Sequence, residues 1–145
     1  MADVVRKLPG WQPILHAYME PFLSLPFEYG TSDCFCFVGG AVAAMTGVNP
    51  CAQFVGRYHS RFGMMRTLLQ HGHRDMASAL DATAYALGWH RTTEQNSRIG
   101  DIAVLPSLQI NALAIRYHGG FVARSMTGLN LAPLGPSLTL WSIPE

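Results

Sequence analysis

Residues 27–47 read FEYGTSDCFCFVGGAVAAMTG, and they predict a loop that leads into a buried helix. From Cys34 to Met45 almost every residue is apolar or small, so we expect this helix to be buried on most of its circumference. Thr31 or Ser32 is expected to cap the start of the helix, and Gly47 to end it.

Cys34 lies in the first turn of this expected helix. The unpaired N–H groups of a helix start favour a thiolate over a thiol, which is how many cysteine nucleophiles are presented. A cysteine in apolar surroundings can equally be an inert packing residue, because cysteine is among the most buried residue types. Cys34 is therefore a candidate nucleophile, with packing as the alternative.

The composition is typical of one folded domain covering residues 1–145. A net charge of +1 gives no electrostatic argument for nucleic acid or an anionic membrane. Hydrophobic residues make up 49% and charged residues only 13%, which indicates surface buried against a partner. We expect no signal peptide, no membrane span and, with three clustered cysteines, no disulfide framework.

The periodicity predicts helices first and an antiparallel sheet last, an α+β arrangement. The helical half comprises residues 11–25, the cysteine helix, two short helices within 51–72 divided by Gly56 and Gly63, and residues 75–87 between Asp75 and Gly88. Arg57, Arg61 and Arg66 are expected on the polar face of 51–72. Short strands are expected at 102–105, 112–117, 120–124, 129–132 and 138–143, the first directly after a Gly100-Asp101 turn.

A cysteine hydrolase needs a general base, and histidine is the usual one. His118 is the only one of the six histidines in the strand half, so it is the candidate base, although it can equally be an exposed turn residue. The alternative of a metal site formed by Cys34, Cys36, Cys51 and a histidine is weaker. Residues i and i+2 of a helix point about 200° apart, so Cys34 and Cys36 would not converge on one ion.

An ordered set of motifs covers nearly the whole chain: Trp11, PFxYGxxDC at 26–34, TGxNP at 46–50, Gly56-Arg57-Tyr58, Gly100-Asp101 and LWSI at 140–143. This set resembles a family of small tailed-phage tail proteins related to the NlpC/P60 cysteine peptidases. The resemblance implies a papain-like fold, with the cysteine helix packed on a small C-terminal antiparallel sheet. It also implies that Cys34 matches the nucleophile, and that a histidine opens the strand after the Gly-Asp turn, near Asn111 or Ala112. His118 stands at the far end of that strand instead.

The resemblance therefore predicts a tail-tip or tail-assembly component, mainly structural, with a degenerate catalytic site. The expected location is the virion tail after synthesis in the host cytoplasm, and the expected partners are other tail proteins. The alternative is an active peptidase that cleaves peptidoglycan stem peptides during DNA entry, with Cys34 as nucleophile and His118 as base. A metal-carrying tail-hub protein is a weaker alternative, and no cofactor is expected.

Overall fold

The computed structural model describes residues 3–106, 112–135 and 139–145. The elements follow one another as α1 (Trp11–Met19), the 3-10 helix η1 (Glu20–Leu23), α2 (Cys34–Thr46), α3 (Arg61–Gln70), α4 (Met76–Leu87), β1 (His90–Thr92), β2 (Ile102–Leu105), β3 (Ala112–Tyr117), β4 (Gly120–Ser125), β5 (Gly128–Ala132) and β6 (Thr139–Ser142). Helices precede a sheet of antiparallel strands, so the α+β prediction is confirmed.

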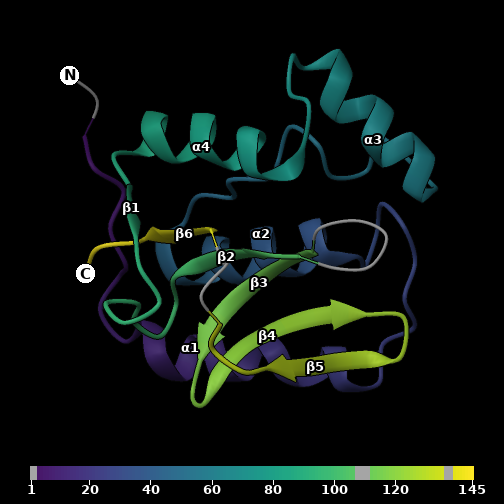
Figure 1. Ribbon diagram of the computed structural model, residues 1–145. Coiled ribbons are helices and arrows are strands. Elements are labelled where there is room, and N and C mark those ends of the chain that lie inside the picture. Colours follow the sequence, from purple (N-terminus) through teal and green to yellow (C-terminus); the bar gives the residue numbers. More distant parts are fainter. Residues whose placement is uncertain (1–2, 107–111, 136–138) are drawn as a thin grey trace.

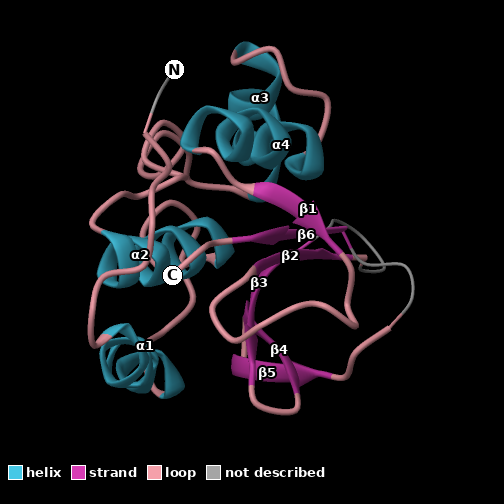
Figure 2. Ribbon diagram, turned by 90° about the vertical axis from the view of Figure 1, so that its left-hand side faces the viewer, coloured by secondary structure: helices cyan, strands magenta, loops and turns pink. Residues whose placement is uncertain are grey.

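The six strands lie in the order β1-β6-β2-β3-β4-β5 (Figure 1). Helices α1 and α2 lie on one side of this sheet, and α3 and α4 lie together beyond its β1 end (Figure 2). The side chains of a strand alternate between the two faces. Accordingly Ile102 and Val104 join the main core, whereas Ala103 and Leu105 belong to a smaller cluster with Phe121.

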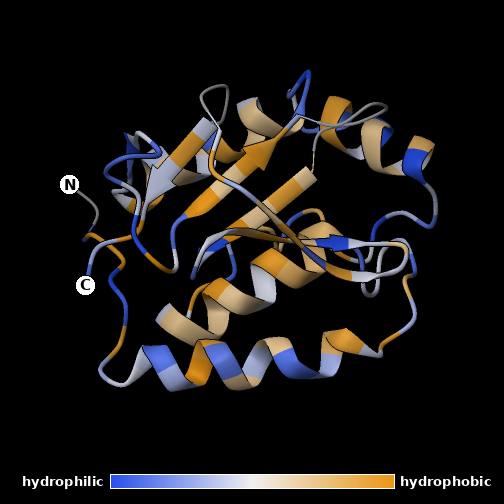
Figure 3. Ribbon diagram, turned by 60° about the horizontal axis from the view of Figure 1, so that its bottom comes forward, coloured by the Kyte–Doolittle hydropathy of each residue, from blue (hydrophilic) through white to orange (hydrophobic). Residues whose placement is uncertain are grey.

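Helix α2 is the most buried helix, and Figure 3 shows it as mainly apolar beside the mixed helix α1. It begins at Cys34 and ends at Gly47, whose φ of 88° is the left-handed conformation that glycine adopts at low cost. The predicted cap was wrong. Asp33 caps the helix by accepting a hydrogen bond from the backbone N–H of Cys36, and the Ser32 hydroxyl donates to the Pro26 carbonyl instead.

Helices α1 and α2 approach closely at Gly40. The Tyr18 hydroxyl of α1 lies where a side chain at Gly40 would begin, and it hydrogen-bonds to the carbonyls of Cys36 and Phe37. The predicted helix over residues 11–25 is observed as α1 followed by η1, because Pro21 has no N–H to continue the α-helical pattern. None of the helices in the described ranges is long and apolar enough to cross a membrane.

The region from 51 to 72 differs from the prediction of two short helices. Residues 50–56 form turns, and one helix, α3, runs through Gly63. Ser60 caps α3 by accepting from the Gly63 N–H, so Gly63 belongs to the first turn rather than to a break. Helix α4, in contrast, has the predicted cap at Asp75 and the predicted end at Gly88.

The strands follow the prediction closely except at two places. Strand β1 was missed, since its three residues lie in a polar segment and only their pairing with β6 makes them a strand. Strand β6 covers most of the predicted 138–143, and Leu138 lies outside the described residues.

Candidate functional site

The Cys34 side chain lies inside the molecule, between the start of α2 and the start of β3. The residue is only 7% exposed and its thiol is free. A hydrogen bond from the Leu113 backbone reaches the sulfur, so the thiol faces the second residue of β3. The cysteine helix thus packs its first turn against the sheet.

Burial raises the pKa of the Cys34 thiol to about 12, and the nearby Asp33 carboxylate adds to this rise. The backbone N–H groups of Leu113, Phe35 and Cys34 itself act in the opposite direction. The helix start therefore favours the thiolate as expected, but the loss of hydration outweighs it. The thiol is protonated at neutral pH in this conformation.

Asp33 organises the loop in front of the cysteine. Its buried carboxylate accepts hydrogen bonds from the Gly30 N–H at 2.8 Å, the Tyr58 hydroxyl at 2.6 Å and the Cys36 N–H at 3.1 Å. Gly30 has a φ of 87°, and a side chain there would meet the Tyr58 carbonyl. The motifs at 26–34 and 56–58 are thus joined through one carboxylate.

Arg124 of β4 holds the same loop from the other side. Its buried guanidinium donates to three main-chain carbonyls, those of Phe22, Leu25 and Ser32. Sequence reasoning missed this residue. Strand alternation could have identified it. Arg124 lies on the same face of β4 as the buried Val122, so its side chain points toward the helices.

His118 does not meet Cys34. It is exposed in the turn between β3 and β4, five residues beyond Leu113, or roughly 17 Å along an extended strand. None of the histidines in the described part of the chain hydrogen-bonds to Cys34. The position where the resemblance expects the histidine is occupied by Ala112 and, before it, by Asn111, which lies outside the described residues.

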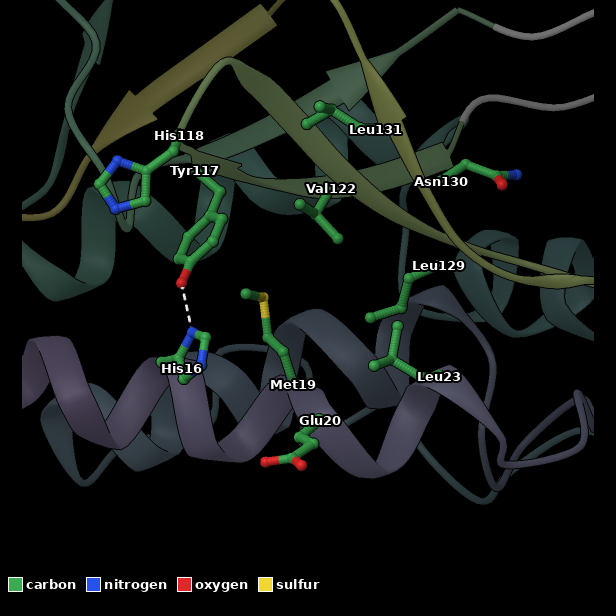
Figure 4. A pocket seen from close by; sticks show the side chains of 10 residues that line it. All are labelled: His16, Met19, Glu20, Leu23, Tyr117, His118, Val122, Leu129, Asn130 and Leu131. Carbon is green, nitrogen blue, oxygen red and sulfur yellow. Dashed lines mark hydrogen bonds between the residues drawn. The ribbon is translucent and has the colours of Figure 1, made fainter.

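His118 lies instead at a groove of about 530 Å³ between α1–η1 and strands β3 to β5. In Figure 4, Met19 and Leu23 of the helical wall face Val122 and Leu129 of the sheet. At one end, His16 and the Tyr117 hydroxyl form a hydrogen bond of 2.7 Å, and the His118 ring packs edge-on against Tyr117 at 4.9 Å. The groove is apolar inside, and Cys34 does not line it.

The Gly100-Asp101 turn ties the sheet to the chain's last residues. Gly100 has a φ of 95°, and the buried Asp101 carboxylate accepts from the N–H groups of Arg98 and Ile143. Burial raises the pKa of Asp101, and the nearby Lys7 ammonium counteracts that rise. This turn is a structural support on the strand next to β3, and it does not touch the thiol.

The three cysteines do not form a metal site of a known kind. Burial raises the pKa of both Cys36 and Cys51, as it does for Cys34. Metal ligation requires thiolates, which these environments disfavour. Across the described ranges, no group of three or more His, Cys, Asp or Glu side chains is placed to hold one ion.

The comparisons with known proteins identify a family but no activity. A family model described as "Domain of unknown function (DUF6950)" matches residues 6–143. Neither the curated proteins nor the solved structures contain a significant match to the chain.

Proposed function

Because the chain belongs to the DUF6950 family, a domain of unknown function, we propose a role from its site and its motifs. The protein is a component of a phage tail, at the tail tip or in tail assembly. It keeps an NlpC/P60-like, papain-like fold and acts by binding other tail proteins rather than by hydrolysis.

The surroundings of Cys34 are the observation that carries this proposal. The cysteine stands at a helix start against the first residues of a strand, which is the arrangement that the resemblance implies. The thiol is nevertheless buried with a pKa of about 12, and Ala112 stands where a base is expected. A nucleophile needs a base within hydrogen-bond reach, so this site favours packing over catalysis.

The assignment to a phage tail is supported by the ordered motifs from Trp11 to Ile143 and by the low charge content of 13%. Residues that become buried between subunits carry few charges. Location in the virion, with other tail proteins as partners, follows from that assignment.

An active peptidase is the second candidate, because Cys34 lies at the start of a helix, where the resemblance expects the nucleophile. For this candidate, an assembled neighbour or a rearranged loop would have to expose the thiol and supply the base.

Purified virions of the producing phage, probed with an antibody against the chain, test the tail assignment and the role of the thiol together. We expect labelling at the distal end of the tail. We also expect that Cys34→Ala particles keep wild-type yield, infectivity and peptidoglycan cleavage. Absence of the chain from virions would contradict the tail assignment. Normally assembled Cys34→Ala tails that no longer cleave peptidoglycan would establish the peptidase instead.

A further inference from the structure

Helix α3 carries an apolar stripe on its outer face. Phe62, Met65 and Leu69 are 72%, 47% and 64% exposed, whereas Met64 and Leu68 of the same helix are buried. The spacing of three and then four residues places the exposed three within one narrow strip of the helix. Helix α3 therefore has apolar side chains on both its buried and its exposed side.

This stripe, which we call the α3 face, is bordered by positive charge. At 100° per residue, Arg61 falls on one side of the strip and Arg66 on the other. Both residues are exposed, and the Arg66 guanidinium lies 5.7 Å from the centre of the Phe62 ring. Helix α3 itself contains no Asp or Glu, so its only charged residues are these two arginines.

We infer that the α3 face docks a partner protein whose contact surface has an apolar centre and a carboxylate rim. The apolar side chains would fill the centre of such an interface, since apolar residues and arginine are the types enriched there. Carboxylates opposite Arg66 would orient the partner and speed its association. Figure 1 shows α3 at the outside of the molecule, where a partner can reach it. The inference does not depend on the tail assignment.

The positive charge beside the stripe favours an acidic protein partner over a second copy of the chain, a membrane or nucleic acid. A second copy of the chain docked face to face would bring the arginines of both copies together, which is unfavourable. A membrane would receive only three side chains, because Met64 and Leu68 on the opposite side of the helix are buried in the protein. Nucleic acid phosphates would meet the arginines but would leave the stripe between them without apolar contacts.

Photocrosslinking of the native assembly tests the inference. A benzophenone amino acid is incorporated at Met65, in the middle of the stripe, and, as a control, at Tyr85 of α4, which is 88% exposed. The chain is irradiated in the cells or particles that normally contain it, and the linked peptide is sequenced by mass spectrometry. We expect a Met65-dependent link to another protein, at a peptide with apolar residues flanked by Asp or Glu.

Two variants separate charge from shape. Arg66→Glu should lower the crosslink yield about tenfold or more, whereas Arg66→Lys should retain most of it. Arg66→Glu should keep helix α3, because glutamate is about as good a helix former as arginine. Circular dichroism checks this. A link to lipid, to nucleic acid, to this same chain or to a peptide without acidic residues would overturn the inference. A yield no higher than that of the Tyr85 control would also overturn it.

Discussion

Tyr58 and Asp33 show how a single hydrogen bond can set the position of the cysteine. The Asp33 carboxylate receives the Tyr58 hydroxyl at 2.6 Å and also caps α2, so the loop at 56–58 and the start of the cysteine helix are fixed together. Burial and the hydrogen bond to Asp33 both raise the pKa of Tyr58, so the hydroxyl remains a donor at all ordinary pH values.

Tyr58→Phe removes this donor and leaves a buried carboxylate oxygen with one partner fewer. We expect the free energy of unfolding to fall by about 1.5–3 kcal/mol, the range for hydrogen bonds to charged groups. Urea unfolding at pH 7 measures the change. The matched control is Tyr85→Phe, whose hydroxyl lies on an exposed side chain and whose loss should cost less than about 0.5 kcal/mol. Equal effects of the two substitutions would mean that the Asp33–Tyr58 bond contributes nothing to stability.

Cys34 itself shows the limit of reasoning from one residue's position. Its place at a helix start was predicted correctly, and the backbone N–H groups there do lower its pKa. The opposing effect comes from the loss of water around the sulfur, which depends on what the sheet places over the helix start. That packing is a tertiary property and is not visible in the spacing of residues 27–47.

Arg124 joins three elements of the fold at once, because it extends from β4 to carbonyls in η1, in the following loop and in front of α2. Its forked guanidinium suits several carbonyls that a single ammonium group could not reach together. The loop that carries Asp33 and the wall of the groove that contains Leu23 therefore depend on one side chain.

Arg124→Lys should lower the free energy of unfolding by about 2–4 kcal/mol, since at least two of the buried carbonyls would lose their donor. Hydrogen exchange should also speed up in residues 22–33. Arg91→Lys provides the control: Arg91 pairs with Asp81 at 2.6 Å on the exposed surface, where such pairs contribute about 0–1 kcal/mol. An equal loss of unfolding free energy in the two lysine variants would mean that contacts other than those of Arg124 fix the loop at residues 22–33.

Local sequence rules predicted most of the helices and strands, and the predictions that were wrong share one physical cause. Helices α2 and α4 have their own caps and glycine stops, so a sequence pattern is enough to find them. Strand β1 exists only because it pairs with β6, at a distance of some fifty residues along the chain. The apolar spacing in 51–72 indicated helix, but which side of α3 is covered depends on its neighbours, so the spacing alone did not reveal that Phe62, Met65 and Leu69 are exposed.

At the scale of the whole molecule, topology decides which candidate residues meet. Strand β3 lies between β2 and β4, with its first residues against Cys34 and its last beside the groove. The separation of His118 from the thiol could be predicted from strand length alone. The position of His118 at the groove beside α1 could not be predicted from the sequence, because this groove depends on how α1, η1 and β5 are placed relative to one another.

The pH dependence of the unfolding free energy reports whether Cys34 is protonated in the folded protein. The pKa of Cys34 rises from 9.0 to about 12 on folding, chiefly because burial removes water from the sulfur. Below pH 9 both the folded and the unfolded chain keep the proton. Between pH 9 and 12 only the unfolded chain releases it, so stability falls as pH rises through this window.

Each pH unit in that window should cost up to about 1.4 kcal/mol for one such thiol. We therefore compare urea unfolding of the wild type and Cys34→Ala, under reducing conditions, at pH 8 and at pH 10.5. The variant should lose less stability between the two values, by up to about 2 kcal/mol. Tyrosines and the other two cysteines titrate in both proteins, so their effects cancel in the difference. An identical loss in both proteins would mean that native Cys34 ionises like an unfolded cysteine. The thiol would then be available as a nucleophile, and the peptidase would become the better proposal.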